Sequence, residues 1–352
     1  SAPGKLHLLG EHVVVYGKPA IITAVSKRCF VEITARRDKR IKITSHNLKV
    51  SKIFTEKEVI ARTKEAQIKW ETYIKTNDMP ILKSITTDAL DFSVIVIGET
   101  LRYLKKSLPF GFELAIKSDI PIGSGMGSSA AVAVSIAGAV SLLFNKNLDK
   151  EAINEIAYLA EQKKHGFPSG GDNAVSCFGG LIWYRKETPD LKIIKPIPFS
   201  FPQKLSKNFI AIHTGISVES TGEMVSLVRN LYREKPEFVE DILSSQEQLT
   251  REILSAIENG DNTLIIRIIR AGERNLERLG VVSDSAKKLI RSIGQIGGAA
   301  KICGAGGKTK GSGMVLAYCT DKKNVEKLAR SNNFLHINLS LGAEGLRQEK
   351  YE

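Results

Sequence analysis

The sequence Ile122-Gly123-Ser124-Gly125-Met126-Gly127-Ser128-Ser129-Ala130-Ala131 alternates glycine with other residues and continues into a run of small apolar residues. The glycines let the backbone turn tightly and approach a ligand closely. The apolar run, residues 130–144, predicts a buried helix whose unpaired N–H groups and positive dipole end face the glycines. Such a helix start binds phosphate through backbone amides, and the tandem serines add hydroxyls for a phosphate oxygen or a magnesium ion. The stretch therefore indicates an enzyme that uses a nucleotide.

Two better-known glycine loops do not fit this stretch. A Walker A loop requires Gly-x4-Gly-Lys-Ser/Thr, and no lysine stands at that place. A dinucleotide fingerprint needs its third glycine where Ser128 stands. A glycine-rich turn before an ordinary core helix remains an alternative on the loop alone.

The composition is that of a globular protein large enough for two domains. Of the 352 residues, 42% are apolar and 25% charged. The longest nearly apolar stretch has about fifteen residues and falls short of the roughly 20 that cross a bilayer. No charged-then-apolar signal segment opens the chain. We therefore expect a cytoplasmic protein with no membrane partner.

The chain is strongly basic, with 51 Lys and Arg against 38 Asp and Glu, a net charge of +13. The basic clusters at 36–40, 163–164 and 308–310 are dispersed and lack interleaved aromatic residues. They predict a solvated surface that attracts small polyanions, not a nucleic-acid partner. The four cysteines include no Cys-x-x-Cys pair, so free thiols in a reducing compartment are expected.

Hydrophobic periodicity divides the chain near residue 195, within the proline-bearing stretch 189–202. We expect one domain over residues 1–195 and a second over 196–352. The first contains predicted strands at 31–35, 41–45, 112–117 and 180–184 and predicted helices at 55–78, 92–105, 130–144 and 150–164. The second contains a strand at 209–213, a helical region at 221–295, and a final strand, glycine turn, strand, helix and strand.

Three further segments carry chemistry-bearing residues. Residues 2–12 place Lys5 after a Pro-Gly turn and Glu11-His12 beyond an apolar run. Residues 161–173 run from a helical glutamate to Asp172-Asn173 through His-Gly-Phe-Pro-Ser-Gly-Gly. Residues 301–307, Lys-Ile-Cys-Gly-Ala-Gly-Gly, form a second glycine turn between predicted strands.

These segments and the first glycine loop resemble, in their order, the motifs of the GHMP kinases, and among these the mevalonate kinases. Residues 3–17 match Pro-Gly-Lys…Gly-Glu-His-x-Val-Val-x-Gly, and 121–131 match the glycine-serine loop. Residues 161–173 match Glu-x3-His-Gly-x-Pro-Ser-Gly-x-Asp-Asn, and 301–307 match Lys-x-x-Gly-Ala-Gly-Gly. Residues 214–225 are also similar, so the resemblance spans nearly the whole chain.

The resemblance implies an α+β fold of two domains, an N-terminal one with a mixed sheet and a C-terminal ferredoxin-like one, with the active site in the cleft between them. It implies ATP and Mg²⁺ as cofactors and phosphorylation of the primary hydroxyl of mevalonate, and a homodimer is common in this family. The expected nucleotide-binding residues are Pro121, Gly123, Ser124, Gly125, Met126, Gly127, Ser128, Ser129 and Ala130.

The chemistry of the acidic residues agrees with this family. Phosphoryl transfer needs charge neutralisation, a metal bridge and an oriented nucleophile. Glu161 lies on the apolar face of its predicted helix, where a buried carboxylate must be paired or bind a metal. Mg²⁺ suits it, with Ser129 as a second oxygen ligand by resemblance. A surface pair between Glu161 and Lys164 is the alternative.

Asp172 is the candidate to accept or orient the proton of the attacking hydroxyl. Lys5 would hold a positive charge beside it, favouring the carboxylate and stabilising the developing alkoxide. An aspartate paired with lysine is a weak base, which indicates orientation and late proton transfer. The alternative for Asp172-Asn173 is a turn or helix cap.

Substrate binding is assigned by resemblance and by polar character. The residues concerned are Glu11, His12, Ser169, Thr214, Gly304 and Ala305. His165 could equally cap the end of its helix. We expect His7, His46, His213 and His336 to be structural or exposed, and no set of histidines has zinc-site spacing.

Two departures from the family pattern concern the loops. Lys308-Thr309-Lys310-Gly311-Ser312 is inserted after the glycine turn of residues 301–307 and puts the substrate fit in question. Gly171 replaces a more usual β-branched residue. The alternatives for function are another GHMP kinase, acting on phosphomevalonate, homoserine or a sugar, and a non-catalytic regulator that binds ATP and a metabolite.

Overall fold

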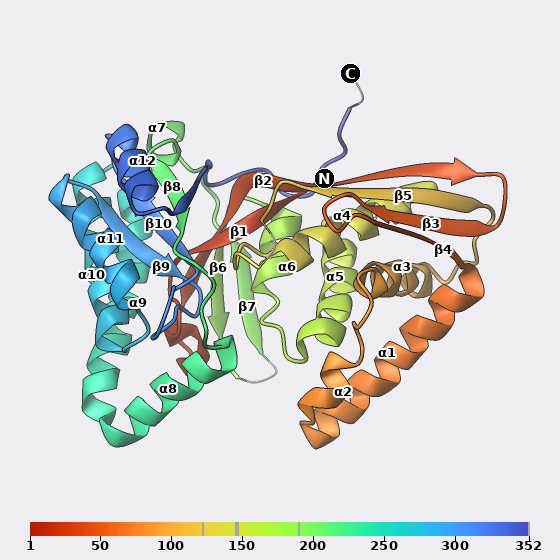
Figure 1. Cartoon of the computed structure of the whole chain (residues 1–352), viewed down its shortest axis with the longest axis horizontal. Helices are drawn as coiled ribbons and strands as arrows, with labels where there is room; N and C mark the ends of the chain where they lie inside the picture. Colours follow the sequence, from red (N-terminus) through yellow and green to blue (C-terminus); the bar gives the residue numbers. More distant parts are fainter. Residues whose placement is uncertain (122, 145–147, 189–190, 351–352) are drawn as a thin grey trace.

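The computed structural model describes residues 1–121, 123–144, 148–188 and 191–350. A seven-stranded mixed sheet forms the first part of the molecule (Figure 1). Its order is β4-β3-β5-β2-β6-β7, with β1 paired to β2, and among the described strands only β3 and β5 run parallel. The strands are β1 (Ala2–Leu9), β2 (Ala20–Arg36), β3 (Arg40–Ser45), β4 (Val50–Thr55), β5 (Gly111–Ser118), β6 (Leu181–Lys186) and β7 (Lys192–Pro196).

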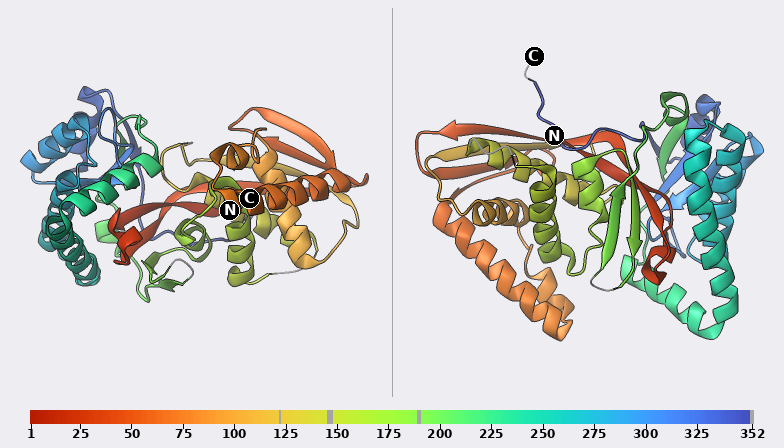
Figure 2. Two further views of the ribbon diagram at one scale, coloured as in Figure 1. Left: turned by 90° about the horizontal axis from the view of Figure 1, so that it is seen from below. Right: turned by 180° about the vertical axis from the view of Figure 1, so that it is seen from behind.

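Helices pack against one face of this sheet (Figure 2). Local signals begin them: Thr55 forms a capping box with Glu58, and the Asp149 carboxylate caps the helix that contains Glu161. The helix after the glycine loop is apolar on most of its surface because it lies between the sheet and neighbouring helices. The helices are α1 (Glu56–Thr76), α2 (Met79–Lys83), α3 (Asp91–Leu104), α4 (Ser128–Leu143), α5 (Lys150–His165) and α6 (Gly171–Phe178), with the 3₁₀ helix η1 (Val13–Tyr16) after β1.

The second part contains a four-stranded antiparallel sheet in the order β11-β8-β10-β9. This is the strand order of a ferredoxin-like fold, so the α+β expectation and both sheet types are confirmed. The elements are α7 (Gln203–Ser206), β8 (Phe209–His213), α8 (Thr221–Glu234), α9 (Pro236–Glu258), α10 (Asn262–Arg278), α11 (Asp284–Gln295), β9 (Ala299–Cys303), β10 (Met314–Tyr318), α12 (Lys322–Ser331) and β11 (Leu335–Asn338).

One hydrophobic core extends from the first sheet into the helices of the second. Leu9 of β1 belongs to the same buried cluster as Ile253 of α9 and Ile268 of α10. The packing is close, since a β-carbon at Gly272 would lie 2.8 Å from Leu9 Cδ2. The strand that carries the first motif is therefore held directly by the second sheet's helices.

The C-terminal segment returns to the first sheet. Val25 pairs with Leu341 and Gly179 with Glu344, and Arg28 donates hydrogen bonds to the carbonyl oxygens of Glu344 and Gly345. A division of the chain at residue 195 would leave this segment crossing from the second domain to the first. That division stays a prediction, and residues 189–190 beside it lie outside the described residues.

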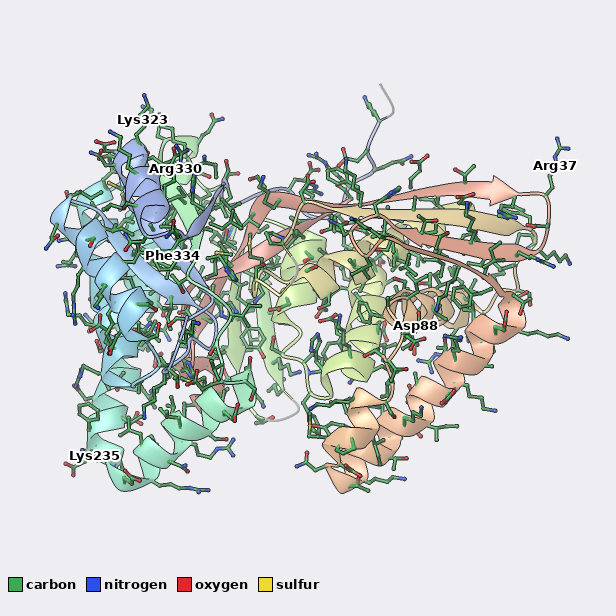
Figure 3. All side chains as sticks on the ribbon, viewed as in Figure 1. Arg37, Asp88, Lys235, Lys323, Arg330 and Phe334 are labelled. Carbon is green, nitrogen blue, oxygen red and sulfur yellow. The ribbon has the colours of Figure 1, made fainter. Side chains whose placement is uncertain are left out.

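The cysteines follow the expectation, but the basic residues do so only in part. Lys163, in a cluster predicted to be solvated, is instead fully buried against Glu99. Arg37 lies at the tip beyond β2, whereas Lys235, Lys323 and Arg330 lie at the other end of the molecule (Figure 3). All four cysteines are buried and free. Among the described helices, none combines the length and apolarity that a membrane span requires.

Candidate active site

The glycine loop is anchored to β1 at the start of α4. The Lys5 N–H donates to the Met126 carbonyl oxygen (2.9 Å), and the Ser124 hydroxyl donates to the Pro121 carbonyl oxygen (2.7 Å). Ser124 and Met126 are buried, so only their backbone groups can serve a nucleotide. Ser128 and Ser129 begin α4 and are partly exposed, as a phosphate-binding helix start requires.

Two different structural constraints explain the three glycines of this loop. Gly123, Gly125 and Gly127 have φ values of 71°, 74° and 68°, in the left-handed region that favours glycine. A β-carbon at Gly123 or Gly125 would meet nothing within 4 Å, so backbone conformation explains these two. At Gly127 it would lie 2.7 Å from Lys5 Cγ. Gly127 therefore allows the lysine side chain to pass the start of α4.

Lys5 and Asp172 meet across this loop. The Lys5 ammonium lies 3.2 Å from Asp172 Oδ2, with Lys5 buried on β1 and Asp172 partly exposed in the first turn of α6. Burial would raise the pKa of Asp172, but the Lys5 ammonium outweighs it and lowers the pKa below its usual value. The structure thus brings together two predicted residues 167 positions apart, and Asp172 is ionised at neutral pH.

Glu161 and Ser129 form the second predicted pair. Ser129 Oγ donates to Glu161 Oε2 (3.2 Å), and Glu161 is 4% exposed on the inward face of α5. Burial and the nearby Asp172 charge raise the pKa of Glu161 to about 7. Glu161 Oε1 is buried with no hydrogen-bond partner in the described part of the chain. The alternative pair with Lys164 does not form, because that ammonium lies over the Phe92 ring.

His165 belongs to this cluster rather than capping its helix. Its Nε2 lies 3.3 Å from Ser129 Oγ and 3.6 Å from Glu161 Oε2. The end of α5 is instead closed by the Gly166 N–H, which donates to the Gln162 carbonyl oxygen. Elements α4, α5, α6 and β1 therefore meet at one place (Figure 1).

Glu11 forms an ion pair inside the protein. Its carboxylate forms an ion pair with the Lys301 ammonium, and both side chains are fully buried. Burial would lower the pKa of Lys301, but Glu11 raises it above its ordinary value. This internal contact joins the first motif, residues 3–17, to the last one, residues 301–307, hereafter the third motif. The contact between Glu11 and a substrate stays a prediction.

His12 and Ala305 also join these two motifs. His12 Nε2 lies 2.9 Å from the Ala305 carbonyl oxygen, and His12 has a φ of 62°. Gly304, just before, has a φ of 88°, which the turn requires. Ser169 is exposed near Asp172, and its hydroxyl accepts from the Gly171 N–H (3.1 Å). Thr214 is buried, and its hydroxyl donates to the Gly313 carbonyl oxygen (3.0 Å).

The inserted residues 308–312 form an ordered turn beside Thr214. The Glu219 carboxylate accepts from the N–H groups of Lys308 (3.2 Å) and Thr309 (2.9 Å) and from the Thr309 hydroxyl. These hydrogen bonds, the Thr309 hydroxyl foremost, lower the pKa of Glu219 to about 2. The Ser312 N–H donates to Thr214 Oγ1 (3.1 Å). The insertion therefore leaves the glycine turn of residues 301–307 intact, and Lys308 lines a hollow next to α8.

Two hollows lie beside this cluster without reaching it. One of about 1040 Å³ opens between Met79 of α2 and residues of α8 and α10, and Lys308 lines it. Another of about 480 Å³ lies between β2, α4 and the C-terminal residues 346–350. Neither is lined by Lys5, Glu161 or Asp172. Neither hollow is therefore the expected cleft that contains the candidate catalytic residues.

Sequence reasoning missed the position of His7. Lys5 and His7 are two residues apart on β1, so their side chains share one face of the strand. Lys5 and Asp172 are the two charges that most affect the pKa of His7, which places its ring beside the candidate catalytic pair. Strand alternation was the signal that would have found it.

An archaeal relative shows to which family the chain belongs. The mevalonate kinase of Pyrococcus furiosus is 34% identical over 362 aligned positions, which cover 99% of this chain and 98% of that protein. The chain belongs to the mevalonate kinase family. Residues 95–180 also match the GHMP kinases N terminal domain.

Solved mevalonate kinases share the fold. The Methanococcus jannaschii enzyme superposes with a TM-score of 0.76, 22% identity and coverage of 97% of this chain and 96% of that one. The L. major mevalonate kinase in complex with R-mevalonate gives a TM-score of 0.72, 21% identity and coverage of 98% and 96%. The resemblance and the kinase fold expected from sequence are confirmed.

A buried glutamate behind the third motif provides a test of the site's electrostatics. Burial raises the pKa of Glu273 to about 8 from 4.5, while its Oε2 accepts from the Ile302 N–H (3.0 Å). The folded state therefore holds a proton that the unfolded state releases, so stability falls as pH rises from about 5 to 8. We expect Glu273→Gln to match the wild type near pH 5 and to exceed its free energy of unfolding by about 3 kcal/mol at pH 8.5. Urea unfolding across this range measures the difference, and a pH-independent difference would contradict the prediction.

Proposed function

We propose that this chain transfers the γ-phosphoryl group of ATP to the primary hydroxyl of mevalonate, with Lys5, Asp172, Ser129 and Glu161 as the central residues. Membership of the mevalonate kinase family supports the reaction and the acceptor. The observation that carries the residue assignment is the 3.2 Å pair between Lys5 and Asp172 at the start of α4. The cytoplasm is the proposed compartment, supported by four unpaired thiols, and a homodimer remains a proposal.

The glycine loop and the start of α4 provide the phosphate site. Backbone N–H groups at a helix start carry partial positive charge and hold phosphate oxygens without a side-chain charge. Lys5 passes against Gly127 at the start of α4, so a γ-phosphoryl group bound there would lie near its ammonium. Positioning and charge neutralisation of this kind account for most of the catalysis of phosphoryl transfer.

Asp172 would orient the attacking hydroxyl. Its lowered pKa keeps the carboxylate ionised, so it accepts a hydrogen bond from the hydroxyl at neutral pH. The same low pKa makes it a weak base, and the proton therefore moves late, after the bond to phosphorus has largely formed. Lys5 holds Asp172 in its ionised form and would neutralise negative charge on the phosphoryl oxygens during transfer.

Glu161 and Ser129 suit a magnesium ion. Glu161 Oε1 is a buried carboxylate oxygen without a partner among the residues that the structure describes, and Ser129 offers a hydroxyl beside it. The described residues contain no cluster of three or more His, Cys, Asp or Glu that could hold a metal. Such a sparse oxygen set fits Mg²⁺, whose other ligands are waters and substrate phosphates. The ion would neutralise charge on the β- and γ-phosphates.

The role of Glu161 can be tested by its Mg²⁺ requirement. We expect Glu161→Gln to raise the Mg²⁺ concentration for half-maximal activity about 10- to 100-fold, because an anionic oxygen ligand is lost. Mg²⁺ titrations of the initial rate at fixed ATP provide the measurement. Glu155→Gln, on the exposed face of the same helix, is the matched control. An unchanged titration for Glu161→Gln would remove Glu161 from the metal site.

A panel of acceptors tests the reaction itself. Purified protein with ATP and Mg²⁺ is assayed for ADP release with mevalonate, phosphomevalonate, homoserine and galactose. We expect mevalonate to give the highest kcat/KM. ADP release with another acceptor alone would overturn the substrate, and nucleotide binding without release from any acceptor would favour a regulator.

A further inference from the structure

His7 is fixed in place at the junction of the first and third motifs. Its backbone pairs with Ile22 of β2, and the Cys303 thiol donates to its carbonyl oxygen (3.3 Å). Its side chain lies on the face of β1 that also presents Lys5. Because Lys5 contacts Asp172, and both charges act on His7, the imidazole lies next to the candidate catalytic pair.

The His7 ring has one nitrogen that the described part of the protein leaves without a partner. Nδ1 is buried and makes no hydrogen bond there. The residue as a whole is partly exposed, so the ring is not sealed in the core. A buried polar atom without a partner costs free energy, and native proteins rarely keep one without a ligand or water to satisfy it. An acceptor bound beside Lys5 would supply that partner.

The charges around His7 keep the imidazole neutral. Burial, the Lys5 ammonium, Lys301 and His12 all lower its pKa, and only Asp172 opposes them, which leaves the pKa at about 3. A neutral imidazole has one nitrogen that donates and one that accepts. It therefore complements a hydroxyl group, which also donates and accepts, better than a carboxylate, which seeks a cation.

We propose that His7 binds the acceptor by a hydrogen bond to a hydroxyl other than the one phosphorylated. This inference rests on the proposed function, since mevalonate carries a tertiary hydroxyl in addition to the primary hydroxyl that is attacked. His7 thereby favours acceptors that carry a second hydroxyl close to the one that is phosphorylated. It adds to the Lys5–Asp172 pair, which acts on the primary hydroxyl.

The test compares two acceptors in two proteins. Wild type and His7→Val are assayed with mevalonate and with 5-hydroxy-3-methylpentanoate, which lacks the tertiary hydroxyl. For mevalonate we expect His7→Val to lower kcat/KM about 10-fold, through the KM for the acceptor, with the KM for ATP unchanged. For the deoxy acceptor we expect the two proteins to be equal within about twofold. His7→Gln, which keeps a donor and an acceptor, should regain part of the activity towards mevalonate.

Each other outcome overturns the inference. Equal losses for both acceptors would indicate a structural role, and no loss for either would indicate no role. His336→Leu on β11 is the matched control and should leave both acceptors unaffected. If His7→Val does not fold, His7→Ala replaces it under the same criterion. If wild type phosphorylates neither acceptor, the proposed function fails, whereas active wild type with an unselective variant contradicts His7 alone.

Discussion

Replacing Asp172 with asparagine is expected to lower kcat about 10²- to 10⁴-fold, the range for loss of a general base. The amide keeps the size of the side chain but cannot take the proton, and it removes the charge that faces Lys5 at 3.2 Å. Binding of ATP should be unchanged because the glycine loop and Ser129 are untouched. Steady-state kinetics with mevalonate and calorimetric titration of ATP measure the two quantities.

Two controls make this result specific. Asp241→Asn, which removes an exposed carboxylate paired with Arg278, should leave kcat unchanged. Lys5→Met combined with Asp172→Asn should cost little more than either change alone, because the two groups act as a unit. Activity of Asp172→Asn near that of the wild type would reject Asp172 as the residue that orients the hydroxyl.

Lys301→Met is expected to give the largest loss of stability, about 3–5 kcal/mol in the free energy of unfolding. The change leaves the fully buried Glu11 carboxylate without its partner. Burial already raises the pKa of Glu11, and loss of the ammonium raises it further. Because the folded state then favours the protonated acid, the variant should recover part of its stability as pH falls towards 5. Chemical unfolding at pH 5 and pH 8 measures both effects.

Lys163→Met is the matched control for this loss. Lys163 and Glu99 are also completely buried, but Glu99 retains Arg102 at 2.5 Å when the lysine is removed. We therefore expect a smaller loss than for Lys301→Met. Glu11→Gln with Lys301→Met should be more stable than Lys301→Met alone, because no buried charge remains. Equal losses in the two lysine variants would contradict the premise that Glu11, unlike Glu99, keeps no second cation when its lysine is removed.

The sequence predicted well those features that neighbouring residues determine, such as the bounds of helices and strands and the buried face of a helix. The strand at 209–213 has the predicted bounds, and the helix after the glycine loop begins at Ser128, within two residues of the expected start. Periodicity also placed Glu161 on the inward face of α5, and the structure buries it there. These features follow from residues close together in the chain, so their pattern is visible without the fold.

The partners of buried polar groups could not be predicted in the same way. Nothing near Glu11 in the sequence indicates that Lys301, 290 residues later, takes its carboxylate. The hydrogen bonds from the inserted turn to the Glu219 carboxylate likewise join segments that are distant in the sequence. Only the pairing of the two sheets and the packing of α10 on β1 bring such groups together, and these depend on the whole chain.

The contacts between the two ends of the chain have a consequence for biosynthesis. Arg28 donates to the Glu344 carbonyl oxygen 316 residues away, and the Arg347 N–H donates to the Ser1 carbonyl oxygen (3.0 Å). The edge that these contacts cover belongs to the part that leaves the ribosome first. Until residues 341–347 emerge, backbone groups at this edge of the amino-terminal half have no protein partner. A chaperone that covers the edge would protect it from aggregation.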